Sequence, residues 1–411
     1  MTTYLNTQFK TFSRILHVAD IHIRMTKRHE EYREVFSKFY SEVNKTPEDT
    51  LVVIAGDLYH NKTDLNPETV DLAGDFLNTL ANSRPTILFA GNHDATLNNK
   101  NRMDSLYPLV KFLNNKNLFY LRESGLYIIG DLLLNNYSIF DDYTQYLPAC
   151  NIPKKLCNET STKIALFHGP VQGAVTDVGY RVVSKTVSNE SFDGHDIVLL
   201  GDIHKHQRLQ EHSVNYNKPI IVYAGSMIQQ NHGEFLEGHG YINWDVKNRE
   251  YQQIDIPNDY GFFTVEIEKG KLYTDVSKMP KKVTLRAKCN QTIPSEVKSL
   301  MAKLSDKHQI IEISYDKTDA EKEEKRNIID TTNINLINIS TNIDYQNQLI
   351  KTYLLEKKPE VMTENLLDQI CDINKEINSK LEKEFTVRNI RWKPKRFEFE
   401  NMFSYGEGNI I

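Results

Sequence analysis

Five short apolar runs, each ending at a polar residue or a glycine, constrain the fold of this chain more than any other feature. They are RILHVAD (14–20), TLVVIAGD (50–57), PTILFAGN (85–92), KIALFHG (163–169) and DIVLLGD (196–202). Near-continuous apolar runs of this length are typical of strands that are buried on both faces of a sheet. Helical patterns separate the first three runs, with one apolar stripe formed by Tyr32, Val35, Phe36 and Phe39 and another by Leu72, Phe76 and Leu80. We therefore predict a layered α/β core with polar residues at the strand ends, where such sheets bind ligands.

A smaller α/β pattern follows the core. Two strand-like runs, GFFTVEI (261–267) and KKVTLRAK (281–288), precede a helical segment, and QIIEISY (309–315) returns as a strand. One face of the helical segment carries Val297, Leu300, Met301 and Leu304. This spacing of three and four residues predicts an amphipathic helix packed on a small sheet.

The remaining residues are more polar. The charged stretch 316–327 is interpreted as a solvated linker, with a surface helix as the alternative. Residues 345–384 are predicted to be helical, with a seam of Leu366, Ile370, Ile373, Ile377 and Leu381 that either packs in a core or binds a partner helix. The final stretch, RFEFENMFSYGEGNII (396–411), alternates like a strand and turns at YGEGN.

Bulk properties narrow the class of protein. A length of 411 residues predicts two or three domains, and a net charge of -5 argues against a generally basic coat for nucleic acid. The polar start lacks the apolar stretch of a signal peptide, and no apolar run is long enough to span a bilayer. The four cysteines show no CxxC spacing. We therefore expect an intracellular protein, cytoplasmic or in a nucleus or viral factory, that does not bind a membrane.

Potential metal ligands stand at the ends of all five predicted strands. They are Asp20, His22, Asp57, Asn92, His168, Asp202 and His204. A single Asp or Asn at a strand end is common turn chemistry, but five successive strand ends are hard to explain in that way. Mixed carboxylate, imidazole and amide ligands suit two divalent ions of the Mn²⁺ type, with Mg²⁺ also possible. Glycines before Asp57 and Asn92 would let the backbone turn tightly toward the ions.

In this order the motifs resemble the calcineurin-like metallophosphoesterase superfamily, whose pattern runs D-x-H, G-D, G-N-H-D/E, H and G-H-x-H. The chain has DIH, GDLYH, GNHD, HG and GDIHKHQ between residues 20 and 206. The resemblance implies a layered β-sandwich core flanked by helices. Aligned on Gly201 and Gln207, it puts Asp202 where the family has its first histidine and His204 on the second. A register that uses His204 and His206 instead remains open.

Further details resemble the DNA nuclease component of the SbcCD type, called Mre-eleven in eukaryotes. A basic helix start (24–36) follows ADIH, His60 stands three residues after Asp57, and YAGS (223–226) precedes GE (233–234). By this resemblance His93 would protonate the leaving sugar oxygen, oriented by Asp94. His60 would help to place the DNA strand, although it could simply pack beneath its loop. The basic residues nearest the motif loops, taken as candidate DNA contacts, are Arg24, Lys27, Arg28 and Arg102.

The resemblance also implies a domain plan. Residues 1–257 would be the nuclease domain, 258–317 a small α/β capping domain, 318–344 a linker, 345–385 helices that bind an SbcC-type ATPase, and 386–411 the first strand and hairpin of such an ATPase. The last assignment predicts a natural nuclease–ATPase fusion, with an ordinary C-terminal hairpin as the alternative. No G-x-x-x-x-G-K-[S/T] motif occurs in the 411 residues.

The expected function is that of an Mn²⁺-dependent DNA exonuclease and endonuclease, paired as a homodimer by analogy. With its ATPase partner it would act in double-strand-break processing, DNA repair and recombination. A metallophosphatase or cyclic-nucleotide phosphodiesterase of the same superfamily would share the ligands but not the cap and the partner helices. A third possibility is a non-catalytic scaffold, against which the intact ligand series and His93 argue.

Overall fold

The computed structural model describes residues 2–97, 99, 102–184, 186–290, 294–317, 343–357, 363–382, 398–399 and 409–410. These residues fall into two compact units, Met1–Asp316 and Lys317–Ile411. Most of the predicted linker 318–344 and of the predicted hairpin 386–411 lies outside the described residues. No helix within the described ranges is both long and apolar enough to cross a membrane.

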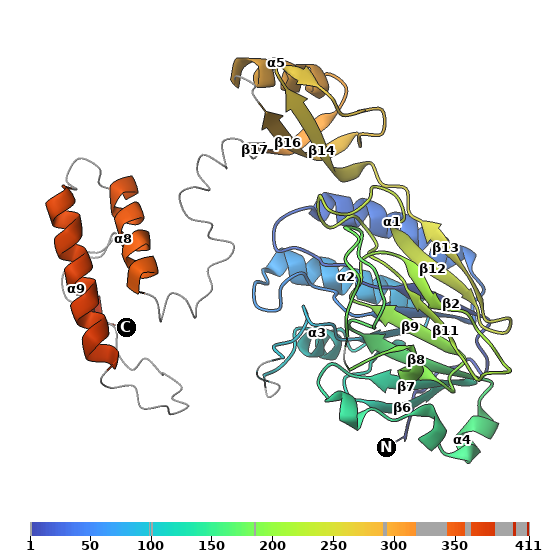
Figure 1. The fold of residues 1–411 in the computed structure, drawn as a ribbon. Coiled ribbons are helices and arrows are strands. Elements are labelled where there is room, and N and C mark those ends of the chain that lie inside the picture. The colour runs from blue at the N-terminus through green and yellow to red at the C-terminus, as the bar shows by residue number, and fades with distance from the viewer. Residues whose placement is uncertain are drawn as a thin grey trace. The chain divides into compact units, whose positions relative to one another are not determined.

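Two sheets form the core of the first unit (Figure 1). The six-stranded sheet has the order β13 (Glu250–Asp255), β12 (Gly240–Asp245), β2 (Arg14–Val18), β3 (Thr50–Ala55), β4 (Thr86–Phe89) and β5 (Leu118–Tyr120). The seven-stranded sheet has the order β1 (Thr2–Tyr4), β6 (Gly125–Ile129), β7 (Leu132–Tyr137), β8 (Thr162–His168), β9 (Ile197–Gly201), β11 (Ile220–Tyr223) and β10 (Gln207–Gln210). All five apolar runs predicted from the sequence are strands, and within each sheet they pair in parallel.

The two sheets pack face to face, and their inner faces share one apolar core. Ile15, Val53 and Ile87 come from the six-stranded sheet, and Leu166 and Leu199 come from the seven-stranded sheet. Because both sheets are covered on their other faces as well, strands such as β3 are buried at every residue. This explains why the runs are almost uninterrupted in apolar character.

Helices cover the outer face of the six-stranded sheet. α1 (His29–Lys45) and α2 (Pro67–Ser83) lie side by side across it, next to the shorter α3 (Leu106–Leu113) (Figure 1). The predicted stripes are buried as expected: Phe39 and Phe76 have no exposed surface, and Phe36 packs with its ring centroid 4.1 Å from that of Phe76. α2 begins with an Asn66 side chain that accepts from the amide of Thr69, followed by a proline at the first turn. The predicted layered α/β core flanked by helices is confirmed.

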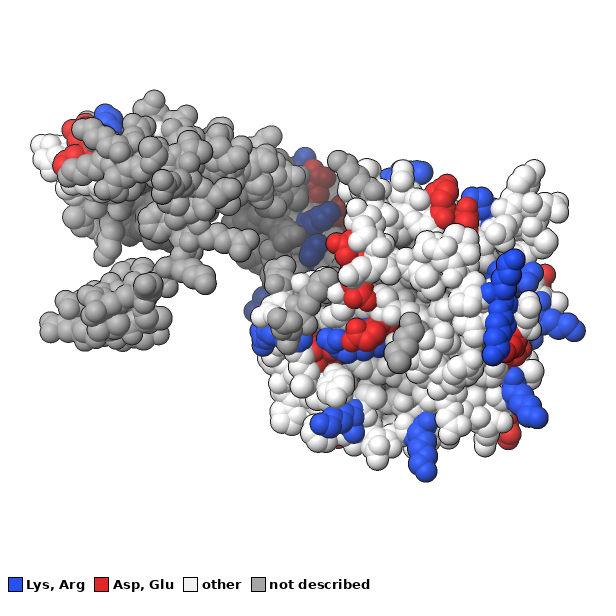
Figure 2. All heavy atoms as spheres, turned by 90° about the horizontal axis from the view of Figure 1, so that it is seen from below, with Lys and Arg blue, Asp and Glu red and all other residues white. Residues whose placement is uncertain are grey.

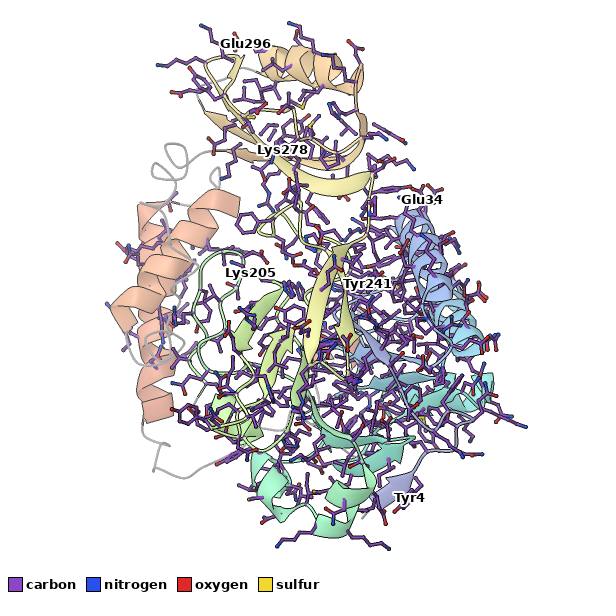
Figure 3. The ribbon with its side chains drawn as sticks, turned by 90° about the vertical axis from the view of Figure 1, so that its right-hand side faces the viewer. Tyr4, Glu34, Lys205, Tyr241, Lys278 and Glu296 are labelled. Carbon is purple, nitrogen blue, oxygen red and sulfur yellow. The ribbon has the colours of Figure 1, made fainter. Side chains whose placement is uncertain are left out.

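A third sheet follows in the same unit, with the order β15 (Lys271–Leu272), β14 (Tyr260–Glu268), β16 (Lys282–Asn290) and β17 (Gln309–Lys317). α5 (Pro294–Ser305) packs on it through Val297, Met301 and Leu304. The sheet contacts the core through α1, where Glu34, which is labelled in Figure 3, lies 2.8 Å from the Lys282 ammonium. The short elements α4 (Lys154–Glu159), η1 (Tyr143–Gln145), η2 (Ala149–Asn151) and η3 (Asn189–Phe192) complete this unit.

The second unit contains α8 (Ile343–Lys357), α9 (Glu364–Glu382) and a two-stranded ladder of β18 (Glu398–Phe399) and β19 (Asn409–Ile410). α8 and α9 pack together and share an amide network, in which Asn374 donates to Gln346 at 3.1 Å. α9 buries Leu367 and Cys371, whereas Ile373 and Ile377 are 56% and 50% exposed. The predicted seam is therefore only partly a core in this chain.

Candidate metal centre

The carboxyl ends of strands from both sheets meet at one edge of the sandwich. β2, β3 and β4 lead into the loops that carry Asp20, Asp57 and Asn92, while His168 is the last residue of β8 and Asp202 follows β9. Backbone bonds lock these loops together, because the amide of Asp20 donates to the carbonyl of Gly56 at 3.2 Å and that of His22 to the carbonyl of Asp57 at 3.0 Å. The fold thus collects the strand-end residues that the sequence separates by up to 184 positions.

Four of these residues form a buried back wall. Asp20, His22, Asp57 and His168 are each exposed by 2% or less. Asp57 lies in the middle, with its Oδ2 atom 3.3 Å from Nε2 of His168 and 3.6 Å from Nε2 of His22. Nδ1–H of His168 donates to the carbonyl of Ala55 at 2.7 Å, which directs Nε2 into the site.

The other three predicted ligands line the partly exposed front. Asn92 Oδ1 is 3.1 Å from Nε2 of His168, and Asp202 Oδ1 is 3.9 Å from the same nitrogen. His204 Nε2 is 3.0 Å from His22 Nε2. All seven strand-end residues therefore lie around one small volume that opens to solvent on one side.

The backbone reaches this arrangement through unusual conformations. Asp20, His22 and Asp57 have φ values of 51°, 53° and 53°, and Asp202 has a φ of 100°. Positive φ is uncommon for residues other than glycine and costs on the order of 1–3 kcal/mol when the structure imposes it. Four such residues in one site indicate a backbone that is bent so that side chains converge.

Two glycines permit the close approach of the loops. A Cβ atom on Gly56, whose φ is 84°, would lie 2.2 Å from Nδ1 of His168. A Cβ atom on Gly91 would lie 2.1 Å from Oδ1 of Asp57. Gly56 is therefore required both by its positive φ and by the close approach of His168, whereas Gly91 is required by the close approach of Asp57.

Burial and mutual proximity shift the pKa values of these groups in opposite directions. Burial raises the pKa of the Asp20 carboxyl to about 7. Burial also opposes ionisation of Asp57, but the adjoining His168 and His22 imidazoles outweigh it and hold the Asp57 pKa below its usual range. The pKa of His168 is raised, since Asp57 and its other acidic neighbours outweigh the burial of the ring. Acidic groups crowded into a buried site in this way favour a compensating positive charge.

The donor set fits divalent cations. Three groups of side chains have ligand atoms within 4.8 Å of one another: Asp20 with Asp57 and His168, Asp20 with His22 and His204, and His22 with His60 and His93. The first two groups combine carboxylate oxygen and imidazole nitrogen, which suit ions of the Mn²⁺ type. Asp20 belongs to both of them, and Asp57 lies within 3.6 Å of an imidazole from each.

The predicted catalytic residues lie at the front of the site, with one difference from the sequence-based expectation. The ring of His93 is 4.7 Å from that of His22 and stacks near that of His60. Its Nδ1–H donates to the carbonyl of His60 at 2.6 Å, not to Asp94. The Asp94 carboxylate is fully buried and accepts from the backbone amides of Tyr59 and Gly91 at 3.0 and 2.9 Å. Asp94 therefore fixes the loops around the site, and the prediction that it orients His93 directly is wrong.

His206, the alternative ligand, faces away from these groups. Its Nδ1–H donates to the carbonyl of Tyr223 at 3.0 Å, and its ring contacts Tyr251. It belongs to none of the three potential metal-binding groups found among the described residues. The geometry favours the register of Asp202 and His204.

The four candidate DNA-contacting residues differ in their exposure and in the partners that they already bind. Arg24 lies beside the site, with Nη1 3.1 Å from Nε2 of His60. Lys27 is exposed and pairs with Glu312 at 3.0 Å, and Arg102 is exposed. Arg28 differs from expectation: its guanidinium is bound to Glu31 at 2.6 Å and to the carbonyl of Gln229 at 2.7 Å, so it forms a mostly buried structural ion pair. On the face that Figure 2 shows, lysines and arginines are spread among uncharged and acidic residues.

Two neighbours of the site were assigned no role there from the sequence. Glu234 places Oε1 2.8 Å from Nδ1 of His204, and the Lys62 ammonium lies 3.5 Å from the carbonyl of Asn92. The dipeptide GE after YAGS was visible as a feature, but its distance of 30 residues from His204 gave no sign of the contact. No motif in the sequence marked Lys62 as a neighbour of the site.

Comparison with known proteins agrees with this geometry. The sequence pattern of the calcineurin-like phosphoesterase family matches residues 13–206, the segment that contains every strand-end residue described above. The chain carries a calcineurin-like phosphoesterase domain. Calcineurin-like phosphoesterases are hydrolases that use divalent metal ions.

Several curated proteins are similar to the chain. An uncharacterized protein of Acanthamoeba polyphaga mimivirus is 34% identical over 97% of this chain, which spans 29% of that protein. The SbcD component of the nuclease SbcCD from Staphylococcus epidermidis is 24% identical over 58% of the chain and 67% of its own length. Its counterpart from Staphylococcus saprophyticus is 25% identical over 59% of the chain and 68% of its own length. The chain is therefore a distant relative of SbcD-type proteins.

Proposed function

We propose that this chain is an Mn²⁺-dependent DNA nuclease that hydrolyses phosphodiester bonds as an exonuclease and endonuclease. The observation that carries the proposal is the place of Asp57, a buried carboxylate 3.3 Å from one imidazole and 3.6 Å from another, each belonging to a separate potential metal-binding group. A carboxylate in this position can serve two ions, as two-metal phosphoester hydrolysis requires. The names of the two staphylococcal relatives support a nuclease over other phosphoesterases.

Seven residues would hold the ions: Asp20, His22, Asp57, Asn92, His168, Asp202 and His204. When bound, two divalent ions lower the pKa of water and offset the negative charge of the phosphate. Asp202 supplies a carboxylate where the family has an imidazole, which adds negative charge and favours hard ions such as Mn²⁺ and Mg²⁺.

His93 would act on the leaving group. Because its Nδ1–H is held by the carbonyl of His60, Nε2 remains to carry a proton to the departing sugar oxygen. Arg24, next to His60, places a guanidinium at the front of the site, where it can bind a backbone phosphate. His60 itself would position the strand.

Partners form a second part of the proposal. The exposed Ile373 and Ile377 of α9 would contact an SbcC-type ATPase, with which the nuclease acts in double-strand-break repair. The exposed Tyr107 and Phe112 of α3 are compatible with a homodimer. A fused ATPase is also proposed, since the mimivirus relative is much longer than this chain, and the parent reading frame would reveal a P-loop downstream or its absence.

A cleavage assay with three substrate classes tests the enzymatic proposal. Purified protein is incubated with Mn²⁺ and, in parallel, end-labelled duplex DNA, a phosphopeptide and a cyclic nucleotide. We expect cleavage of DNA that a chelator abolishes. Asp57→Asn serves as the control for contaminating nuclease, because asparagine tolerates positive φ but removes the shared charge, and it should be inactive. Hydrolysis of only the phosphopeptide or the cyclic nucleotide would replace the proposal with another superfamily activity.

A further inference from the structure

Glu234 lies in the loop between β11 and β12, and its carboxylate accepts three hydrogen bonds, one of them from His204 of the metal centre. Its side chain is only 5% exposed. Oε1 accepts from Nδ1–H of His204 at 2.8 Å and from the amide of Asn231 at 2.7 Å, and Oε2 accepts from the backbone N–H of Gln230 at 2.6 Å. A carboxylate withdrawn from water to this extent is costly unless such partners compensate it.

The contact with His204 differs from those of the neighbouring imidazoles. Nδ1–H of His168, His93 and His206 is held by a neutral backbone carbonyl in each case. His204 alone among these four rings is held by a carboxylate. A carboxylate partner fixes the tautomer, so that the Nε2 lone pair faces His22 and Asp20, and it makes the imidazole a stronger electron donor.

The loop itself is held in place by the third sheet. The Gln229 side chain accepts from the N–H of Phe262 at 2.7 Å and donates to the carbonyl of Glu234 at 2.9 Å. Phe262 belongs to β14, so the Gln229 side chain links the backbone of the third sheet to the backbone of Glu234. The carboxylate is therefore preorganised before any ion binds.

We propose that Glu234 is a positioning residue that sets the orientation and the metal affinity of His204. The proposal rests on the proposed metal centre and deepens it, since it predicts that the ion nearest His204 depends on a residue outside the seven ligands. Loss of a partner that orients a metal-binding histidine typically weakens metal affinity by about 10–100-fold.

The test uses Mn²⁺ alone and full-length protein. Isothermal titration and the electron paramagnetic resonance signal of free Mn²⁺ measure affinity and stoichiometry in the wild type, Glu234→Gln, His204→Ala and the double variant. We expect Glu234→Gln to weaken one class of site by about 10–100-fold and the other by much less. In the His204→Ala background the same change should have little further effect, because the two residues act as one unit.

Glu237→Gln is the matched control. Glu237 lies three residues along the same loop, is 79% exposed and pairs with Lys278, which is labelled in Figure 3. The substitution Glu237→Gln removes the same charge as Glu234→Gln and should leave Mn²⁺ affinity unchanged. The thermal unfolding midpoint of each metal-free variant separates an effect on affinity from an effect on the fold.

Two results would overturn the proposal: Glu234→Gln that binds Mn²⁺ within twofold of the wild type, or a loss that is equally large without His204. If Glu234→Gln does not fold, Glu234→Asp takes its place, because it keeps the charge on a shorter side chain. Unchanged Mn²⁺ affinity of Glu234→Asp would also contradict the proposal. Because no step uses DNA, a wild type that binds Mn²⁺ but leaves DNA intact would contradict the proposed function and still leave this test readable.

Discussion

At the scale of single residues, several residues of the site have backbone conformations that are unfavourable in most of a protein. Asp20, His22, Asp57 and Asp202 all have positive φ. Aspartate and histidine occur in this region more often than most residues, and the short side chain of aspartate can bond locally there. Backbone strain of this kind persists only where the surrounding structure imposes it, and here both sheets impose it on the same few residues.

His93 is the residue whose replacement best separates chemistry from metal binding. His93→Leu should leave Mn²⁺ stoichiometry intact, since the seven predicted ligands remain, but should reduce the turnover of DNA by roughly 10²–10⁴-fold, the usual contribution of a general acid. Single-turnover cleavage and Mn²⁺ titration on the same preparation measure the two effects. If metal occupancy falls together with turnover, His93 is a ligand and its proposed role is wrong.

At the scale of secondary-structure elements, buried polar side chains join segments that the apolar core alone would not align. His195, just before β9, donates from Nδ1 to the carbonyl of Phe192 at 2.8 Å, and its Nε2 accepts from the Asn135 amide of β7 at 3.1 Å. Both ring nitrogens are therefore used by a neutral imidazole. Burial lowers the pKa of His195 to about 4, from an ordinary value of 6.5.

This lowered pKa predicts an acid-sensitive link between the two strands. Above pH 6.5 His195 is neutral in both the folded and unfolded states, and its contribution to stability is complete. As the pH falls from 6.5 toward 4, the unfolded state takes up a proton that the folded state rejects, so stability is lost. Between about pH 7 and pH 5 the loss should be about 2 kcal/mol.

Urea unfolding of the metal-free protein at these two pH values, compared with His195→Gln, isolates the contribution of His195. The glutamine variant is expected to be less stable at neutral pH but to lose less on acidification. Equal losses in the two proteins would show that His195 is not the group responsible.

At the scale of the whole molecule, every residue of the candidate metal centre and of the loop around Glu234 belongs to the first compact unit. That unit has its own apolar cores between the two sheets, under α1 and α2, and beneath α5. Metal binding and the fold of this unit should therefore not depend on residues 317–411.

A chain shortened to residues 1–316 should keep its Mn²⁺ affinity within about twofold and its cooperative thermal unfolding, because no described contact of the site is removed. Calorimetric titration and circular dichroism on the short and full chains provide the comparison. A large loss of affinity in the short chain would show that the second unit contributes to the centre.

The order of the apolar runs and the polar residues that end them were sufficient to predict the layered core and the set of residues that meet at its edge. This was possible because strands buried on both faces leave a nearly continuous apolar signal, and parallel strands bring their carboxyl ends to one edge. The stripes of α1 and α2 were equally readable, since a helix that covers a sheet repeats its apolar residues every three or four positions.

What only the tertiary structure decided were the partners of individual side chains. Asp94 binds backbone amides, not His93; Arg28 is bound to the carbonyl of Gln229; His206 turns toward Tyr223; and Glu234 reaches His204 across 30 residues. Each of these contacts depends on how loops cross at the sheet edge, and loop crossings leave no periodic signal in a sequence. The residue types present at the centre could therefore be predicted from the chain itself, whereas the atoms that each one contacts follow only from the packing of the two sheets.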